Sequence, residues 1–247
     1  GSEFISTWRI ATDQQRTADQ YYVWLSSLIT LGKIKVDITD VIISSTVPRV
    51  VFNLRILADR YFNTRPFVVG KPDCALPVDV RVDEGTGVGP DRLVNTVAGY
   101  DLFGGDLILV DFGTATTFDV VDADGAYVGG AIAPGLRMQL KALHEQTAAL
   151  PSIEFDGAFD APTGTAWGAD TREAMLRGVY HGARGLVWRL VEKYAEEYGA
   201  FPIVLATGGD SAVLFADDEL VTQIVPDLVL RGMAIAARHA LEPDAND

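Results

Sequence analysis

The stretch Leu107-Ile-Leu-Val-Asp-Phe-Gly-Thr-Ala-Thr-Thr-Phe-Asp-Val-Val121 decides the fold class of this chain. It opens with a fully apolar run that ends in a carboxylate, and residues 116–121 have the composition of a second strand. The turn residues Asp122-Ala-Asp-Gly125 come next, and residues 126–132 have the pattern of a third strand. Three consecutive strands joined by tight turns predict an antiparallel meander.

Short strands alternate with amphipathic helices along the rest of the chain. The patterns predict strands at 4–10, 40–44, 66–69 and 203–206, and helices at 17–31, 48–61, 91–100, 136–150 and 171–198, with two more helices after residue 209. Gly32 stands where the first helix should end, and we expect it to adopt the left-handed conformation there. This alternation predicts an α/β fold.

The composition excludes several classes of protein. With 34 acidic and 20 basic residues the formal net charge is −14, which argues against a protein that coats nucleic acid. No apolar run approaches the roughly 20 residues that a membrane helix needs, and the first residues lack the features of a signal peptide. The single Cys74 and three scattered histidines exclude a disulfide framework and a Cys-rich zinc site. We expect a cytoplasmic protein.

The segment Asp111-Phe-Gly-Thr-Ala-Thr-Thr117 is typical of a cation and phosphate site. A carboxylate at a strand end supplies an oxygen ligand, while the following turn supplies backbone N–H groups and hydroxyls. Gly113 has no Cβ, so a nucleotide can approach the backbone there. Taken alone, the segment fits an ordinary glycine-containing hairpin with an exposed Asp equally well.

The segment Ala206-Thr-Gly-Gly-Asp210 follows an apolar strand and precedes a predicted helix. Consecutive glycines let an adenosine lie against the backbone near a helix N-terminus, where the helix dipole favours anions. In isolation a flexible strand-to-helix turn is the simpler explanation. Together with the Asp111 segment, it favours a nucleotide site.

A third segment, Gly89-Pro-Asp-Arg92, begins a predicted helix. One interpretation is structural, because an Asp in the first turn of a helix caps it or interacts with its dipole. The functional interpretation is that Asp91 accepts a proton from a substrate hydroxyl while Arg92 holds a substrate oxygen. The two roles are compatible.

Seven stretches, in order and nearly end to end, resemble the type III pantothenate kinase family. They are Trp8-Arg-Ile-Ala-Thr-Asp13, Arg16-Thr-Ala-Asp19, Ile43-Ser-Ser-Thr-Val-Pro48, Gly89-Pro-Asp-Arg-Leu-Val-Asn95, Val110-Asp-Phe-Gly-Thr-Ala-Thr-Thr-Phe-Asp119, Gly129-Gly-Ala-Ile-Ala-Pro-Gly135 and Ala206-Thr-Gly-Gly209.

The resemblance implies the fold of the acetate-kinase, sugar-kinase, heat-shock ATPase and actin superfamily, a two-lobed, ribonuclease H-like α/β fold with mixed sheets around an ATP cleft. We place an N-terminal lobe with the substrate turn at 1–104, and a C-terminal lobe with the cation and adenosine motifs at 105–247. The implied reaction is the phosphorylation of pantothenate to 4'-phosphopantothenate by ATP, the first step of coenzyme A synthesis. The implied cofactors are Mg²⁺ or another divalent cation and K⁺ or NH₄⁺. The implied assembly is a homodimer. Gly178 and Gly182 on the long predicted helix would allow a close helix contact between its subunits.

The resemblance also implies site residues, which are matched position by position to this sequence. Asp91 matches the family's proton acceptor, and Gly89, Pro90 and Arg92 belong with it to the pantothenate-binding turn. Asp111 matches the monovalent-cation ligand. The remaining matches are Thr171 as a further pantothenate contact, Thr114 with Gly113 as ATP contacts, and Thr207, Gly208 and Gly209 as the adenosine turn.

The sequence also departs from the family pattern. The family opens with a strand and an Asp-x-Gly-Asn-Thr-Asn loop that cradles the ATP phosphates, and no such pattern precedes Trp8. We therefore expect the first strand and this loop to be missing, either from this stretch of sequence only or from the protein. Val82 stands where many members have Tyr, and Asp170 replaces an Asn, which we interpret as the cap of the helix that begins at Thr171.

Two hypotheses follow. The first is a pantothenate kinase, and the second is a non-catalytic regulatory or binding relative of the same fold that lacks the phosphate loop. The intact cation, adenosine and substrate motifs favour the kinase, because a relative that had lost catalysis would have no physical need for all three.

Overall fold

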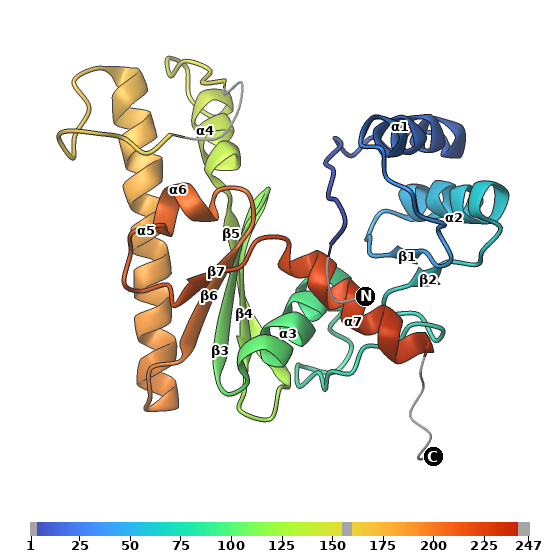
Figure 1. Ribbon diagram of the computed structural model, residues 1–247. Helices are drawn as coiled ribbons and strands as arrows, with labels where there is room; N and C mark the ends of the chain where they lie inside the picture. The colour runs from blue at the N-terminus through green and yellow to red at the C-terminus, as the bar shows by residue number, and fades with distance from the viewer. Residues whose placement is uncertain (1–3, 155–159, 242–247) are drawn as a thin grey trace. The chain divides into compact units, whose positions relative to one another are not determined.

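The computed structural model describes residues 4–154 and 160–241, and the chain divides into two compact units (Figure 1). Unit 1 comprises Gly1–Ala75 with Ala237–Asp247, and unit 2 comprises Leu76–Ala236. Our division into functional lobes at residues 104 and 105 stays a prediction. Every candidate site residue belongs to unit 2.

Unit 1 contains helices α1 (Ala18–Leu31) and α2 (Pro48–Phe62) and the short parallel strands β1 (Ile42–Ile43) and β2 (Phe67–Val68). Helix α1 begins with a capping box between Thr17 and Gln20, whose side chains each bond to the other's backbone N–H. The left-handed residue after α1 is Lys33, with φ 52°, and not Gly32, which keeps a helical φ of −73°. The left-handed conformation therefore falls one residue later than Gly32, where the tolerance of glycine for positive φ predicted it.

The strand predicted at 4–10 is absent from the described part of unit 1. Those residues form no regular element, and most of their side chains are exposed. A strand needs a partner for its backbone N–H and C=O groups. In the described residues of unit 1 the only strands, β1 and β2, pair with each other, so the alternating pattern of residues 4–10 has no sheet to join.

Unit 2 is built on a mixed sheet of five strands. Its strands are β3 (Leu107–Phe112), β4 (Ala115–Val121), β5 (Tyr127–Pro134), β6 (Ile203–Thr207) and β7 (Gln223–Ile224), in the order β5-β4-β3-β6-β7. The pairs β3–β4 and β4–β5 are antiparallel, which confirms the predicted meander, whereas β3–β6 and β6–β7 are parallel. This is the ribonuclease H-like arrangement that the resemblance implied. The two-residue strand β7 is too short for its pattern to be seen in the sequence.

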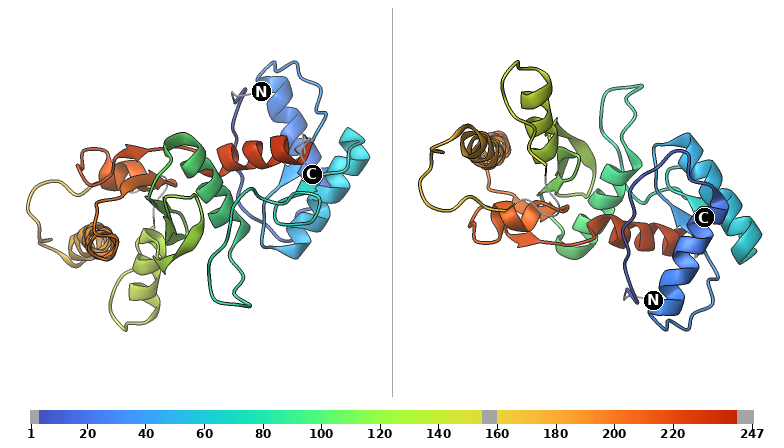
Figure 2. Two further views of the ribbon diagram at one scale, coloured as in Figure 1. Left: turned by 90° about the horizontal axis from the view of Figure 1, so that it is seen from below. Right: turned by 90° about the horizontal axis from the view of Figure 1, so that it is seen from above.

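Helices cover both faces of this sheet (Figure 1). Alternate residues of β3 face opposite ways: Ile108 and Val110 pack with α5 (Thr171–Tyr198) and α6 (Ser211–Phe215), while Leu107 and Leu109 pack on the side of α3 (Pro90–Phe103) and α7 (Leu228–Leu241). Figure 2 looks down α5, the longest helix, which runs beside the sheet. The apolar run in β3 is therefore buried on both faces.

Helix α4 (Leu136–Glu145) ends earlier than the predicted 136–150. The Thr147 hydroxyl donates to the carbonyl of Leu143 at 2.7 Å and so satisfies a free carbonyl of the last turn. Helix α5 has the predicted bounds, and its cap is confirmed because the Asp170 side chain accepts a bond from the backbone N–H of Glu173 at 2.8 Å.

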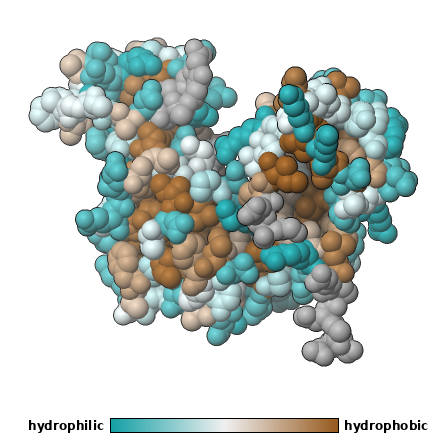
Figure 3. Space-filling view, in the orientation of Figure 1, coloured by the Kyte–Doolittle hydropathy of each residue, from teal (hydrophilic) through white to brown (hydrophobic). Residues whose placement is uncertain are grey.

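The surface of unit 2 is not uniformly hydrophilic despite the acidic composition. In Figure 3 hydrophobic side chains gather where Figure 1 places α6, β6 and β7. Across residues 4–154 and 160–241, no helix is both long enough and apolar enough to cross a membrane.

Candidate active site

The cation and adenosine motifs lie side by side because β3 and β6 are parallel neighbours. Asp111, near the end of β3, is in register with Thr207, the last residue of β6. Gly208 follows with φ +90°, and a Cβ there would lie 2.5 Å from both Asp111 Oδ1 and the carbonyl oxygen of Phe112. Only glycine fits this position. In open α/β sheets ligands bind outside the carboxyl ends of the strands, and both motifs lie at such ends.

Asp111 is a partly buried carboxylate. Burial raises its pKa, a hydrogen bond from Asn95 lowers it, and the nearby charge of Asp91 raises it. The bond runs from Asn95 Nδ2 to Asp111 Oδ2 at 3.4 Å, and Asn95 Oδ1 is buried with no hydrogen-bond partner among the described residues. A bound cation would favour the charged form of Asp111 and satisfy Asn95 Oδ1.

The substrate turn begins α3. Gly89 is the N-cap, Pro90 the first helical residue, and Asp91 lies exposed in the first turn. The Asp91 carboxylate folds back over Gly89, where a Cβ would lie 2.5 Å from Asp91 Oδ1. Since it accepts no hydrogen bond within the described ranges, the Asp91 carboxylate is available to a substrate hydroxyl.

Arg92, next to Asp91, is held against the sheet. Its Nε donates to Asp119 Oδ1 at 2.6 Å, its Nη2 donates to the carbonyl of Phe118 at 2.8 Å, and its guanidinium lies 5.6 Å from the ring centroid of Tyr127. Burial raises the pKa of Asp119 to about 7, against the opposing charge and hydrogen bond of Arg92.

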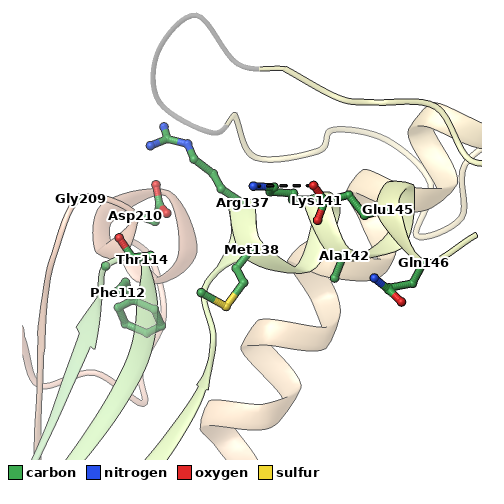
Figure 4. Close-up of a pocket in the computed structure, with 11 residues that line it drawn as sticks. Phe112, Thr114, Arg137, Met138, Lys141, Ala142, Glu145, Gln146, Gly209 and Asp210 are labelled. Atoms are coloured by element: carbon green, nitrogen blue, oxygen red, sulfur yellow. Dashed lines mark ion pairs between the residues drawn. The ribbon is translucent and has the colours of Figure 1, made fainter. Parts of the chain in front are cut away.

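A cavity of about 670 Å³ opens beside the nucleotide motifs (Figure 4). Gly113, Thr114 and Gly209 contribute the strand-end side, and α4 contributes the other side through Arg137, Met138, Lys141, Ala142, Glu145 and Gln146. Met138 points toward Phe112, and Arg137 extends to the side where Asp210 lies. The α4 wall is partly basic.

Gly135 fixes the distance between the two sides of this cavity. A Cβ on Gly135 would lie 2.5 Å from the carbonyl oxygens of Gly113 and Thr114, and its N–H bonds to the Thr114 carbonyl at 3.2 Å. The start of α4 is therefore tied directly to the turn that follows Asp111.

A family model described as type III pantothenate kinase matches residues 1–193 of this chain, and curated relatives described in the same way are more than half identical to it. The chain belongs to the type III pantothenate kinase family. The relative from Roseobacter denitrificans is 56% identical, over 99% of this chain and 93% of its own length. The relative from Dinoroseobacter shibae is 58% identical, over 94% of this chain and 89% of its own length.

A solved structure supports the fold alone. A Campylobacter jejuni protein of the Baf family superposes with a TM-score of 0.51 at 21% identity, covering 87% of this chain and 89% of that protein. At this identity only the fold is comparable, so the type III pantothenate kinase assignment depends on the sequence matches.

The structure brings most of the predicted residues of this family member to the same end of the sheet. Asp91 interacts electrostatically with Asp111, Asp111 lies against Gly208, and Gly113, Thr114 and Gly209 share one cavity. Thr171 is the exception. It is the exposed first residue of α5, and no hydrogen bond joins it to the other candidates within the described residues.

Two kinds of residue at the site of this type III pantothenate kinase family member were not named from the sequence pattern. Asn95 and Asp119 are the last residues of two of the family motifs. A charged residue inside a mostly apolar strand, such as Asp119 in β4, indicates that it has a buried partner. The cavity residues of α4, Arg137 and Lys141, carry no such signal. They resemble any exposed basic residues of an amphipathic helix.

Proposed function

We propose that this chain transfers the γ-phosphoryl group of ATP to the hydroxyl of pantothenate, giving 4'-phosphopantothenate in the first step of coenzyme A biosynthesis, with Asp91 as the proton acceptor. Its place in the type III pantothenate kinase family supports this reaction. The observation that supports the role of Asp91 is its placement: it is an exposed carboxylate in the first turn of α3, it accepts no hydrogen bond within the described ranges, and its charge acts on Asp111.

Phosphoryl transfer does not require a strong general base. Phosphoryl transfer passes through a loose transition state, so the protein contributes mainly by orienting the nucleophile and neutralising the phosphate oxygens. Asp91 would accept the hydrogen bond of the attacking hydroxyl and then its proton. Arg92 would hold a second oxygen of pantothenate, with Gly89 and Pro90 shaping the turn and Thr171 making a further contact.

We assign ATP to the strand ends. Thr114 and the Gly113 backbone would contact the phosphates, and Thr207, Gly208 and Gly209 would face the adenosine. Gly208 admits no side chain beside Asp111, and this close packing keeps the turn at residues 207–209 next to the candidate cation ligand. The adjoining cavity along α4 has the volume for part of a nucleotide.

Two cations belong to the proposal. A divalent ion such as Mg²⁺ would neutralise charge on the ATP phosphates, and Asp111 would hold K⁺ or NH₄⁺, with Asn95 Oδ1 as a further oxygen. No three His, Cys, Asp or Glu side chains come together as a metal site within the described ranges. Mg²⁺ is usually held by one or two carboxylates with substrate phosphates and water, so a dedicated protein cage is not needed for this proposal. These cations would neutralise phosphate charge.

We also propose a cytoplasmic homodimer. The support comes from α5, where a Cβ on Gly178 or Gly182 would meet no atom within 4 Å. Neither glycine therefore serves packing inside the described chain, and both leave room for the close approach of a second copy.

The test measures ADP release with the protein expressed from its full open reading frame, with and without pantothenate and K⁺. Asp91→Asn should lower kcat at least about a hundredfold if this group is the base. Asp101→Asn is the matched control, because Asp101 is also an exposed carboxylate on α3. Wild-type turnover in Asp91→Asn would remove this residue from the base role. Pantothenate binding by calorimetry without ADP release would support the non-catalytic alternative.

A further inference from the structure

Asp119 is a charged residue in the interior of unit 2. It lies in β4 between the buried residues Phe118 and Val120, and its side chain is 1% exposed. Burying a carboxylate is costly unless a charged, hydrogen-bonded partner compensates for its lost hydration. In the proposed reaction this carboxylate has no role of its own, so its partner indicates what it does.

The partner of Asp119 is Arg92. The Asp119 carboxylate contacts one edge of the Arg92 guanidinium. The ion pair at Nε is 2.6 Å long, and the Arg92 side chain is only 15% exposed. Nη2 is occupied by the Phe118 carbonyl, whereas Nη1 donates to no described residue. The inner edge of the guanidinium is thus fixed by the protein, and the Nη1 side is left for a ligand.

The strand opposite β4 makes room for this arrangement. Gly130 of β5 is in register with Asp119, and a Cβ on Gly130 would lie 2.8 Å from Arg92 Nη2 and 1.7 Å from the Phe118 oxygen. The Tyr127 ring covers the guanidinium from one side. The glycine at position 130 of the family motif is therefore explained in part by the space that Arg92 needs.

We propose that Asp119 is a positioning residue for pantothenate: it holds the Arg92 guanidinium in the orientation in which Nη1 binds a pantothenate oxygen, beside the Asp91 carboxylate. This inference depends on the proposed function. Asp119 itself touches no substrate, because Arg92 and β4 enclose it. Its effect must pass through Arg92, and it must concern pantothenate and not ATP.

A double-mutant cycle with Asp119→Asn and Arg92→Lys tests this dependence. Asparagine keeps an acceptor oxygen but removes the charge, so the guanidinium should lose its fixed orientation. At pH 8, where the Asp119 carboxylate carries its charge, we expect Asp119→Asn to raise the KM for pantothenate at least about tenfold, with the KM for ATP within about twofold of the wild type. In the Arg92→Lys background, Asp119→Asn should add less than about twofold. An equal effect of Asp119→Asn in both backgrounds, or no effect in either, would overturn the proposal.

Asp218→Asn is the matched control. Asp218 is also a buried carboxylate of unit 2, 5% exposed, and it pairs with Arg184 of α5 away from the substrate turn. Both Asp→Asn variants should lower the melting temperature. Only Asp119→Asn should change the KM for pantothenate, and a change in both would mean that the effect is general destabilisation.

A measurement on the wild-type protein covers the case in which Asp119→Asn does not fold. The ¹⁵N-bound Nε–H proton of Arg92, assigned by its loss in Arg92→Lys, should exchange slowly with water and persist when pantothenate is added. Exchange as fast as that of exposed arginines would overturn the proposal. Wild-type protein that neither binds nor phosphorylates pantothenate would contradict the proposed function instead, so the two failures are distinguishable.

Discussion

Gly208 lies so close to Asp111 that a single added carbon would fall 2.5 Å from the carboxylate oxygen Oδ1. The two residues come from separate motifs far apart in the sequence, and they meet because β3 and β6 are parallel neighbours. This contact joins the candidate cation ligand to the candidate adenosine turn, and it can be tested directly.

Gly208→Ala should destabilise unit 2 and weaken nucleotide binding. The left-handed φ of +90° and the contact with Asp111 both disfavour a side chain, so we expect a loss of about 1–3 kcal/mol in the free energy of unfolding and a higher KM for ATP. Urea unfolding and steady-state kinetics measure the two effects. Gly87→Ala is the matched control: an added Cβ there meets no atom within 4 Å and φ is not left-handed, so it should instead stabilise by about 0.4–1 kcal/mol. Unchanged stability in Gly208→Ala would contradict the close approach of Gly208 to Asp111.

Asp111→Asn should remove the dependence on K⁺. An amide carries no charge to offset a cation, so K⁺ affinity should fall at least about tenfold. The measurement compares turnover in KCl with turnover in choline chloride. Both are used at equal ionic strength, so that charge screening by salt is the same and the difference reports K⁺ binding. A variant that keeps the wild-type response to KCl would separate Asp111 from the cation.

The stability of the protein should depend on pH through Asp119. Its pKa rises from 3.8 in the unfolded chain to about 7 in the fold, so the stabilisation that it contributes is complete below about pH 4 and is lost as the pH rises through 7. The free energy of unfolding of the wild type minus that of Asp119→Asn should therefore fall between pH 4 and 7, by at least about 1 kcal/mol. Urea titrations of both proteins at several pH values give this difference. A difference that is flat, or that rises with pH, would mean that Arg92 keeps Asp119 ionised throughout.

A bulky residue on the open face of α5 should disrupt the proposed dimer. Gly182→Leu adds a side chain where the described chain leaves space, so the subunit should still fold while a close helix contact could not form. Light scattering after gel filtration measures the mass, and circular dichroism checks the helix content. A dimer that persists in Gly182→Leu would place the subunit contact elsewhere.

Local patterns predicted much of unit 2 because they depend on neighbours in the sequence. The apolar run at 107–111 gave β3, the turn at 122–125 joined β4 to β5, and Asp170 capped α5 as expected. The strand predicted at 4–10 failed for the opposite reason, since pairing depends on a partner that its own residues do not encode.

The sequence by itself determined the family of this protein and named Asp91, Asp111 and the glycine turns as candidates, because motif order and spacing are local properties that the chain states directly. Only the tertiary structure decided which of these residues meet. It enclosed the side chain of Asp119 with that of Arg92, 27 residues away, and laid Gly208 against Asp111. Strand pairing and helix packing bring such residues together, and the burial that fixes their charges exists only once the chain has folded.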